Sequence, residues 1–252
     1  MSARGLRLVD AVRSDTGKVR AHNEDSLIAR PQAGLWAVAD GMGGLERGEW
    51  ASATITDALA AASLASDFDV DTSRVAEAIH AANTTIHVES EKAGKQMGST
   101  VVALLVNGRR FAVLWAGDSR AYLLRGGALH RLTRDHTQVQ EMVDRGLLSA
   151  DDAKRHPMSH VLSRAAGVEP GLELDAIADE AEVGDVFLLC SDGVHGVLSD
   201  AEIGQGLALE RPQAACDRLL EQCLERGAPD NVTLIAVACE EVTLLSPAPS
   251  GA

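Results

Sequence analysis

Acidic residues lie at the ends of apolar runs throughout this 252-residue chain. Asp40, Asp118 and Asp192 each follow an apolar run, whereas Asp25 and Asp230 each precede one. Strand ends and strand starts meet at one edge of an antiparallel sheet, so these carboxylates are expected to lie together. Oxygen donors without nearby cysteine or histidine select Mg²⁺ or Mn²⁺ rather than Zn²⁺. Two such ions about 4 Å apart can activate a bridging water toward phosphorus, which predicts a phosphoester hydrolase.

Each motif also has a simpler interpretation when it is taken alone. Asp40-Gly41 and Asp192-Gly193 are common turn sequences, because Asp binds its own backbone and Gly accepts a positive φ. Arg20 could hold two phosphate oxygens in a fork, or it could be a solvated arginine at a strand end. The glycines after Asp40 match neither GxxxxGK[ST] nor GxGxxG, which argues against a nucleotide-binding loop. Isolated turns do not explain why all of the motifs occur at run ends.

The runs that carry these motifs are short, rich in β-branched or aromatic residues and separated by turn residues, which predicts strands. The expected strands cover 6–12, 26–30, 35–39, 101–106, 111–116, 121–125, 128–132, 172–178, 185–190 and 232–239. Apolar residues at helical spacing predict helices over 47–64, 72–93, 199–209 and 213–226. Strand blocks that alternate with helix pairs indicate an α+β fold with two sheets covered by helices.

Residues 135–167 differ from the rest of the chain. Polar helical segments over 138–146 and 149–155 replace the strand pattern there, which indicates an inserted subdomain. With no internal repeat, residues 1–241 are expected to form one domain, and 242–252, rich in Pro, Ser and Gly, a flexible tail.

Composition and charge exclude several classes of partner. With 46% hydrophobic residues the chain can bury a sizeable core, and its formal charge of -14 argues against binding nucleic acid or an anionic membrane. No apolar stretch approaches the ~20 residues of a membrane helix, and no signal-peptide core is present, so we expect a cytoplasmic monomer without membrane insertion. The four cysteines form no CxxC pair and are expected to be reduced and structural: Cys190, Cys216, Cys223 and Cys239.

Six motifs occur in an order that resembles the PP2C (PPM) family of metal-dependent protein serine/threonine phosphatases. They are Arg20-Ala21-His22-Asn23-Glu24-Asp25, Val38-Ala39-Asp40-Gly41-Met42-Gly43-Gly44, Met97-Gly98-Ser99-Thr100, Ala116-Gly117-Asp118-Ser119-Arg120, Cys190-Ser191-Asp192-Gly193 and Pro229-Asp230-Asn231-Val232. The resemblance runs from about Asp10 to Cys239, and 135–167 is similar to the flap subdomain of bacterial members. It implies a central antiparallel β-sandwich flanked by helix pairs, with a metal centre in a cleft at one edge.

The resemblance also implies roles for individual residues. Two core Mn²⁺ or Mg²⁺ ions would be held by Asp25, Asp40, Asp192, Asp230 and the backbone carbonyl of Gly41. Asp118, together with Asp192, would hold a weaker third ion. Glu24 would act on the ions through water, and Arg20 would bind the substrate phosphate.

One position departs from the eukaryotic members of the family. They have a histidine after Asp-Gly, proposed as the general acid, whereas this chain has Met42, as bacterial members commonly do. Methionine cannot donate a proton. A metal-bound water, or alternatively His22, would have to protonate the leaving alkoxide. His136, His156 and His160, in or near the flap, are expected to have surface or packing roles.

The leading hypothesis is a bacterial protein phosphatase that hydrolyses phosphoserine and phosphothreonine by direct attack of a metal-activated water. Its partners would be phosphorylated proteins and a cognate eukaryotic-like serine/threonine kinase. A second hypothesis is a catalytically silent relative that binds phosphoproteins or kinases, although silent relatives usually lose ligand carboxylates and none is missing here. A third is an enzyme for small phosphoesters or nucleotides, against which the lack of a nucleotide-base pocket signature weighs slightly.

Overall fold

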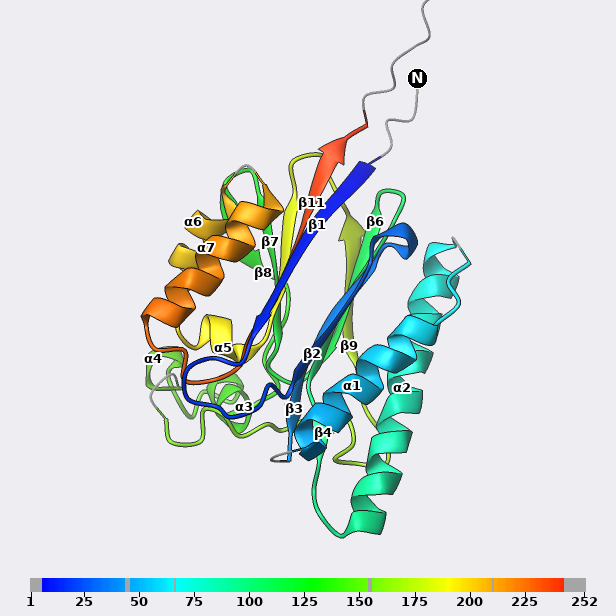
Figure 1. The fold of residues 1–252 in the computed structure, drawn as a ribbon, viewed down its shortest axis with the longest axis vertical. Coiled ribbons are helices and arrows are strands. Elements are labelled where there is room, and N and C mark those ends of the chain that lie inside the picture. The colour runs from blue at the N-terminus through cyan, green and yellow to red at the C-terminus, as the bar shows by residue number, and fades with distance from the viewer. Residues whose placement is uncertain (1–5, 44–45, 66, 154–155, 210, 243–252) are drawn as a thin grey trace, which may run out of the picture.

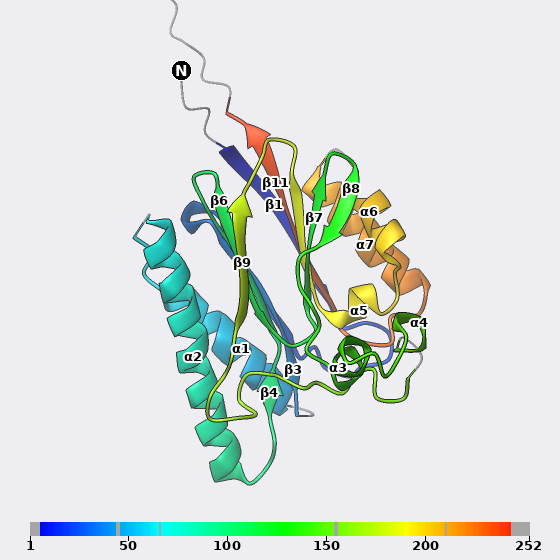
Figure 2. The same ribbon diagram turned by 180° about the vertical axis from the view of Figure 1, so that it is seen from behind.

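Two antiparallel β-sheets stack face to face in the computed structural model, which describes residues 6–43, 46–65, 67–153, 156–209 and 211–242. Helices cover the outer face of each sheet, so the chain forms helix, sheet, sheet and helix layers (Figure 1, Figure 2). The predicted α+β sandwich flanked by helices is confirmed. None of the described helices is long and apolar enough to cross a membrane.

The two sheets have simple antiparallel neighbours. The first has the order β1 (Leu6–Asp15), β11 (Val232–Glu241), β10 (Val186–Cys190), β7 (Arg120–Arg125) and β8 (Ala128–Arg131). The second has the order β2 (Asp25–Arg30), β3 (Leu35–Met42), β5 (Val101–Asn107), β6 (Arg110–Ala116) and β9 (Asp175–Glu180), with β4 (Gly98–Ser99) paired to β3. A 3-10 turn, η1 (Pro31–Ala33), joins β2 to β3.

The helices fall into three groups. α1 (Glu46–Ala61) and α2 (Phe68–Ala93) cover the second sheet, and α5 (Asp192–His195), α6 (Asp200–Leu207) and α7 (Pro212–Glu225) lie on the side of the first (Figure 1). α3 (Gln138–Asp144) and α4 (Ala150–Ala153) belong to the segment between β8 and β9, which contains the residues predicted to form a flap.

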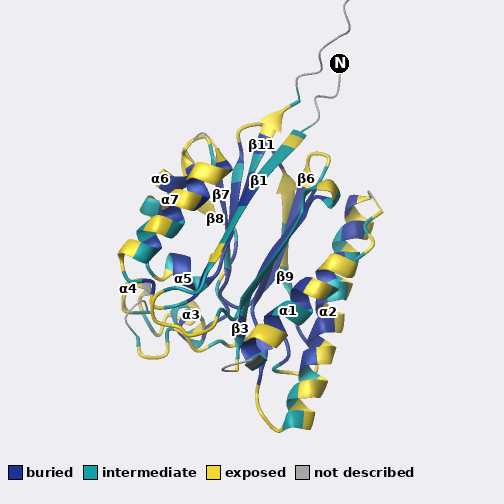
Figure 3. Cartoon of the chain, viewed as in Figure 1, coloured by how far each residue is buried: buried dark blue, intermediate teal, exposed yellow. Residues whose placement is uncertain are grey.

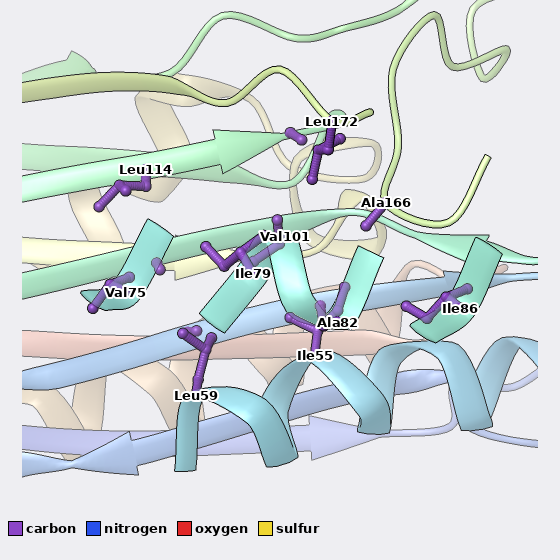
Figure 4. Close-up of a cluster of buried hydrophobic side chains, with 14 of the residues drawn as sticks. Ile55, Leu59, Val75, Ile79, Ala82, Ile86, Val101, Leu114, Ala166 and Leu172 are labelled. Carbon is purple, nitrogen blue, oxygen red and sulfur yellow. The ribbon is translucent and has the colours of Figure 1, made fainter. Parts of the chain in front are cut away.

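Alternating side chains on the strands build the core on both faces of each sheet. On β3, Trp36 and Val38 face the other sheet, whereas Leu35 and Ala37 belong to the cluster beneath α1 and α2. Figure 4 shows part of that second cluster, in which Ile55 of α1 and Ile79 of α2 gather with residues of the sheet. Burial is concentrated along the strands and the inner faces of the helices (Figure 3). The four cysteines are all buried and unpaired.

Several element boundaries differ from the predicted ones, and the starts of α2 and β9 differ for identifiable reasons. α2 begins at Phe68 rather than at residue 72, because the carboxylate of Asp67 accepts the Val70 N–H at 3.0 Å and caps the helix. β9 covers Asp175–Glu180 rather than 172–178, and Leu172 instead packs into the cluster beneath α1 and α2. The predicted strand began at an apolar residue that is buried without pairing.

Two further differences concern the predicted metal ligands. β3 does not end before Asp40 but continues to Met42, because Met42 pairs with Gly98 of β4. Asp192 does not lie in a simple turn but begins the short helix α5, which the sequence did not indicate.

The two ends of the flap are joined to each other, and its C-terminal end is joined to β4. An antiparallel bridge joins Thr137 to Leu162, and a second joins Ala166 to Ser99 of β4. The proposed tail lies, from residue 243 onward, outside the described residues, and the division of the chain into one domain with a flap and a tail stays a prediction.

Candidate metal centre

The predicted ligand carboxylates come from both sheets. Asp25 and Asp40 are cross-strand partners in the pairing of β2 with β3. Asp192 follows β10, and Asp230 precedes β11, the antiparallel neighbour of β10. Asp118 lies in the connection from β6 to β7, which crosses from one sheet to the other. These residues therefore come together where strand ends and strand starts meet, as the strand pattern predicted.

A cleft of about 1030 Å³ opens at this place. Its lining includes most of the predicted site, namely Arg20, Glu24, Asp40, Gly41, Asp118, Asp192 and Asp230. Residues 160–165 of the flap contribute to the same lining. Asp25 does not line the cleft, but the Ser191 hydroxyl, next to Asp192, donates to its Oδ2 at 2.8 Å.

Burial and mutual repulsion raise the pKa of four carboxylates here, namely Asp25, Asp40, Asp118 and Asp192. Burial raises the pKa of Asp25 to about 7 and that of Asp118 to about 8, and the charge of Asp192 adds to both shifts. Burial also raises the pKa of Asp40 well above its usual range, with Asp25 and Asp192 as the next causes. The pKa of Asp192 is raised by burial and by Asp230. Positive charge in the cleft would relieve this repulsion.

Hydroxyl groups from the Met97–Thr100 motif hold the backbone of Asp40. The Asp40 N–H donates to Thr100 Oγ1 at 3.0 Å, and Ser99 Oγ donates to the Asp40 carbonyl at 3.0 Å. Thr100 Oγ1 is also 2.6 Å from Ser119 Oγ, one residue beyond Asp118. This motif therefore connects the strand that carries Asp40 with the loop that carries Asp118.

Two glycines allow the Glu24 segment to approach the end of β3. A Cβ on Gly41 would lie 2.0 Å from the carbonyl oxygen of Gly48 and 2.7 Å from that of Glu24. A Cβ on Gly48 would lie 2.4 Å from Glu24 Oε1. The Gly41 N–H donates to the Glu24 carbonyl at 3.1 Å, which leaves no space for a side chain at either glycine.

Arg20 lies at the mouth of the cleft, with its side chain 51% exposed. Its Nη2 is 2.6 Å from Asp230 Oδ2. The hydrogen bond to Asp230 raises the pKa of Arg20 further, so this group is always charged. A guanidinium with one side on a carboxylate and the rest exposed can still donate to a phosphate oxygen.

Sequence reasoning assigned no role to two residues inside the quoted motifs. Asn231, only 6% exposed, accepts the Glu24 N–H at 2.8 Å and donates to the carbonyls of Thr16 and His22, both at 2.9 Å. Ser191 donates to Asp25 and accepts the Thr233 N–H at 3.1 Å. Each lies next to a predicted metal ligand, Asp230 or Asp192. A polar side chain buried there needs hydrogen-bond partners, and this could have marked both residues in the sequence.

The histidines differ in their relation to the cleft. His160 is the only imidazole among the described residues of the lining, and its Nδ1 is 3.9 Å from Asp192 Oδ2. His22 is exposed and does not line the cleft. His156 accepts the Met158 N–H at 3.2 Å within the flap, which agrees with a local packing role. His136 is buried and accepts the backbone N–H of Gly117, next to Asp118, whereas His160 is exposed. The expectation of surface or packing roles for these histidines stays a prediction.

The chemistry of these donors fits hard divalent cations. Glu24 Oε1 and Asp25 Oδ1 are buried and have no hydrogen-bond partner, which is costly for a carboxylate unless a cation or water satisfies it. The described residues contain no group of three His, Cys, Asp or Glu side chains already gathered tightly around one point, so the fit rests on donor type, burial and unsatisfied oxygens.

Comparison with known proteins gives the same family throughout. Residues 8–142 match the family model for protein phosphatase 2C. The chain is 41% identical over 236 residues to the serine/threonine protein phosphatase PstP of Mycobacterium tuberculosis, a match that covers 89% of this chain and 44% of PstP. It is 33% identical over 236 residues to the serine/threonine phosphatase Stp of Listeria innocua, covering 89% of this chain and 93% of Stp.

A solved structure agrees with these sequence matches. The catalytic domain of PstP in complex with two manganese ions superposes with a TM-score of 0.84 at 38% identity, covering 93% of this chain and 99% of that domain. The chain spans less than half the length of the first curated relatives that it matches. With half of its length in the family model and relatives matched along nearly their whole length, the chain belongs to the protein phosphatase 2C family.

Proposed function

We propose that this chain is a metal-dependent phosphatase that removes phosphate from phosphoserine and phosphothreonine in proteins. One observation carries the proposal: carboxylates from the ends of both sheets line a single cleft that also contains the exposed guanidinium of Arg20. The relatives are named serine/threonine phosphatases, which supports phosphoproteins as the substrate class. We further propose that the partner reaction is phosphorylation by a bacterial eukaryotic-like serine/threonine kinase, and that the chain acts as a monomer.

The proposed metal ligands are Asp25, Asp40, Asp192, Asp230 and the Gly41 carbonyl for two core Mn²⁺ or Mg²⁺ ions. Asp118 with Asp192 would hold a third ion. The ions, when bound, supply Lewis acidity and an activated water for direct attack on phosphorus.

The remaining roles belong to the chain itself. Glu24 has a buried, unpartnered Oε1 beside the cleft, which suits an acceptor for ordered water. Arg20 would donate to the phosphate oxygens and orient the phosphorus atom for in-line attack. Flap residues 160–165 border the cleft and would restrict which phosphorylated segments enter.

Hydrolysis of a phosphothreonine peptide tests the proposal. Phosphate release would be measured with Mn²⁺, with EDTA, and in Asp192→Asn, with Asp179→Asn as the matched control because Asp179 is exposed on β9 and outside the cleft lining. We expect turnover in wild type and Asp179→Asn, and its loss with EDTA and in Asp192→Asn. Activity that survives EDTA would contradict the metal mechanism.

The same assay separates the alternatives. A folded, Mn²⁺-loaded protein that is inert on phosphopeptides and aryl phosphates would be a silent phosphoprotein-binding relative. Turnover of free nucleotides or small phosphoesters without turnover of phosphopeptides would indicate a small-molecule phosphatase.

A further inference from the structure

The loop that carries Asp118 is held by two histidines from outside its own strands. The Gly117 N–H donates to His136 Nδ1 at 3.1 Å, and the His136 N–H donates to the Gly117 carbonyl at 2.9 Å. On the other side, His195 Nε2 is 3.0 Å from the Asp118 carbonyl. Gly117 has a φ of +109°, and a Cβ there would lie 2.6 Å from the Thr100 Cβ. The backbone on the N-terminal side of Asp118 is therefore fixed mainly by His136.

The imidazole of His136 is fixed in one tautomer. Because Nδ1 accepts a backbone N–H, it carries no hydrogen, and the hydrogen of the neutral ring lies on Nε2. Nε2 is 3.2 Å from Asp175 Oδ2, which can accept that hydrogen, and also 3.2 Å from Arg164 Nη1. Arg164 can only donate, so it forms no hydrogen bond with an Nε2 that carries a hydrogen and instead binds Asp175. Burial, and the charge of Arg164, lower the pKa of His136, in agreement with a neutral ring.

The surroundings of His136 also restrict how its ring can rotate. The ring stacks on Trp115, with centroids 6.2 Å apart and an angle of 11° between the planes. Arg164, at the end of the flap, donates to Asp175 Oδ1 at 2.8 Å and so holds the carboxylate that faces Nε2. With its side chain 9% exposed, the ring itself is largely shielded from water, and so is its bond to the buried Gly117 N–H.

We propose that His136 is a positioning residue for Asp118. Asp175 fixes its tautomer, and its Nδ1 holds the Gly117 N–H, so the backbone presents the Asp118 carboxylate to the cleft. The inference rests on the proposed role of Asp118 as a ligand of the third, weaker ion. Groups that orient metal ligands typically change metal affinity about 10- to 100-fold when they are removed.

Two substitutions at His136 separate this role from simple packing. Asparagine places an amide oxygen near the position of Nδ1, whereas glutamine reaches the position of Nε2. His136→Asn can therefore keep the bond to Gly117 and lose the one to Asp175, and His136→Gln does the opposite. Asp175→Asn leaves the ring in place but can donate to Nε2, which would put the hydrogen on Nδ1 against the Gly117 N–H.

The test is Mn²⁺ binding to metal-free protein, with free Mn²⁺ measured by electron paramagnetic resonance. Asp118→Asn identifies the weakest site, and His130→Gln, an exposed histidine on β8, is the control. We expect His136→Gln and Asp175→Asn to weaken that site by about 10- to 100-fold and leave the tighter sites unchanged. His136→Asn should bind like wild type. A second readout needs no metal: the Gly117 amide should exchange faster with solvent in His136→Gln and not in His136→Asn.

Each contrary result has a distinct meaning. If Asp118→Asn binds as many ions as wild type, the assignment of Asp118 fails and the inference fails with it. If Asp118→Asn loses an ion but His136→Gln and Asp175→Asn do not weaken it, only the inference is overturned. Equal weakening in folded His136→Asn and His136→Gln would also overturn it, because the bond to Gly117 would then not be what matters. Should His136→Gln fail to fold, Asp175→Asn decides by itself.

Discussion

Asn231 accepts the backbone N–H of Glu24 at 2.8 Å, which joins the start of β11 to the loop between β1 and β2. The same side chain donates to the carbonyls of Thr16 and His22. One buried amide thus holds three points of the loop that carries Arg20 and Glu24. The loop has other contacts, such as the Lys18 N–H with the Ala228 carbonyl, but no other described side chain holds it at three points.

We expect Asn231→Ala to lower the free energy of unfolding by about 2–3 kcal/mol, since three backbone groups would lose a buried partner. Activity toward a phosphopeptide should fall as well, because Arg20 and Glu24 would no longer be positioned. Urea unfolding and steady-state kinetics measure the two effects. Unchanged stability would mean that water replaces the amide without cost.

Arg20→Ala should lower kcat/KM for a phosphothreonine peptide by about 10- to 100-fold, the amount expected for a lost charge-assisted hydrogen bond. Arg20→Lys should recover only part of the loss, because an ammonium cannot form the two-pronged contact. Arg218→Ala, an exposed arginine on α7, is the control. If Arg20→Ala turns over the peptide like wild type, the guanidinium serves only its ion pair with Asp230.

The sequence predicted the gathering of the carboxylates because it depends on strand polarity, which alternation and turn residues reveal. Asp25 and Asp40 illustrate this, since they are register partners in neighbouring strands. Family resemblance was needed to divide the carboxylates among ions, because the order of residues along a strand does not say which oxygen faces which ion.

What the sequence could not predict depends on contacts between distant segments. His136 meets Gly117 and Asp175, which lie 19 and 39 residues away along the chain, and no local pattern marks such a meeting. The start of α2 was missed for another reason, because Asp67 and Phe68 precede the first clear apolar repeat. The helix begins where Asp67 caps it, and the apolar periodicity does not mark that position. The continuation of β3 to Met42 was missed because its partner there, β4, is only two residues long and leaves no strand pattern in the sequence.

Mn²⁺ should stabilise the fold by about 2.7 kcal/mol at a concentration 100 times its dissociation constant. Asp192→Asn should reduce this gain and, without metal, raise the free energy of unfolding, because the raised pKa of Asp192 shows that its charge is unfavourable in the fold. Thermal and urea unfolding with EDTA and with Mn²⁺ measure both changes. The expected result is a crossing, in which the variant is more stable without Mn²⁺ and less stable with it. Equal gains in the two proteins would argue against Asp192 as a ligand.

Glu202 gives a prediction about pH that is independent of the cleft. Its ion pair with Arg226, followed by hydrogen bonds from Ser199, lowers its pKa from 4.5 to about 2. A carboxyl whose pKa is lower in the folded than in the unfolded protein stabilises the fold at pH values above its unfolded pKa. This contribution is lost as the pH falls from about 4.5 to about 2. Wild type should therefore exceed Glu202→Gln in stability at pH 6, and the difference should shrink by pH 2.5. Urea unfolding at several pH values checks this, with Glu49→Gln on α1 as control; a difference that is constant with pH would contradict it.

Met42 cannot protonate the leaving alkoxide, and the sequence left a metal-bound water or His22 for this role. The structure adds His160 as a further imidazole to test. His160 lines the cleft and His22 does not. We expect His160→Gln to lower kcat/KM for a phosphothreonine peptide by up to about 100-fold and to spare p-nitrophenyl phosphate, because nitrophenolate leaves without a proton. His22→Gln should leave both substrates unaffected. Equal losses on both substrates in His160→Gln would assign His160 to phosphate binding, and a loss confined to the peptide in His22→Gln would make His22 the proton donor instead.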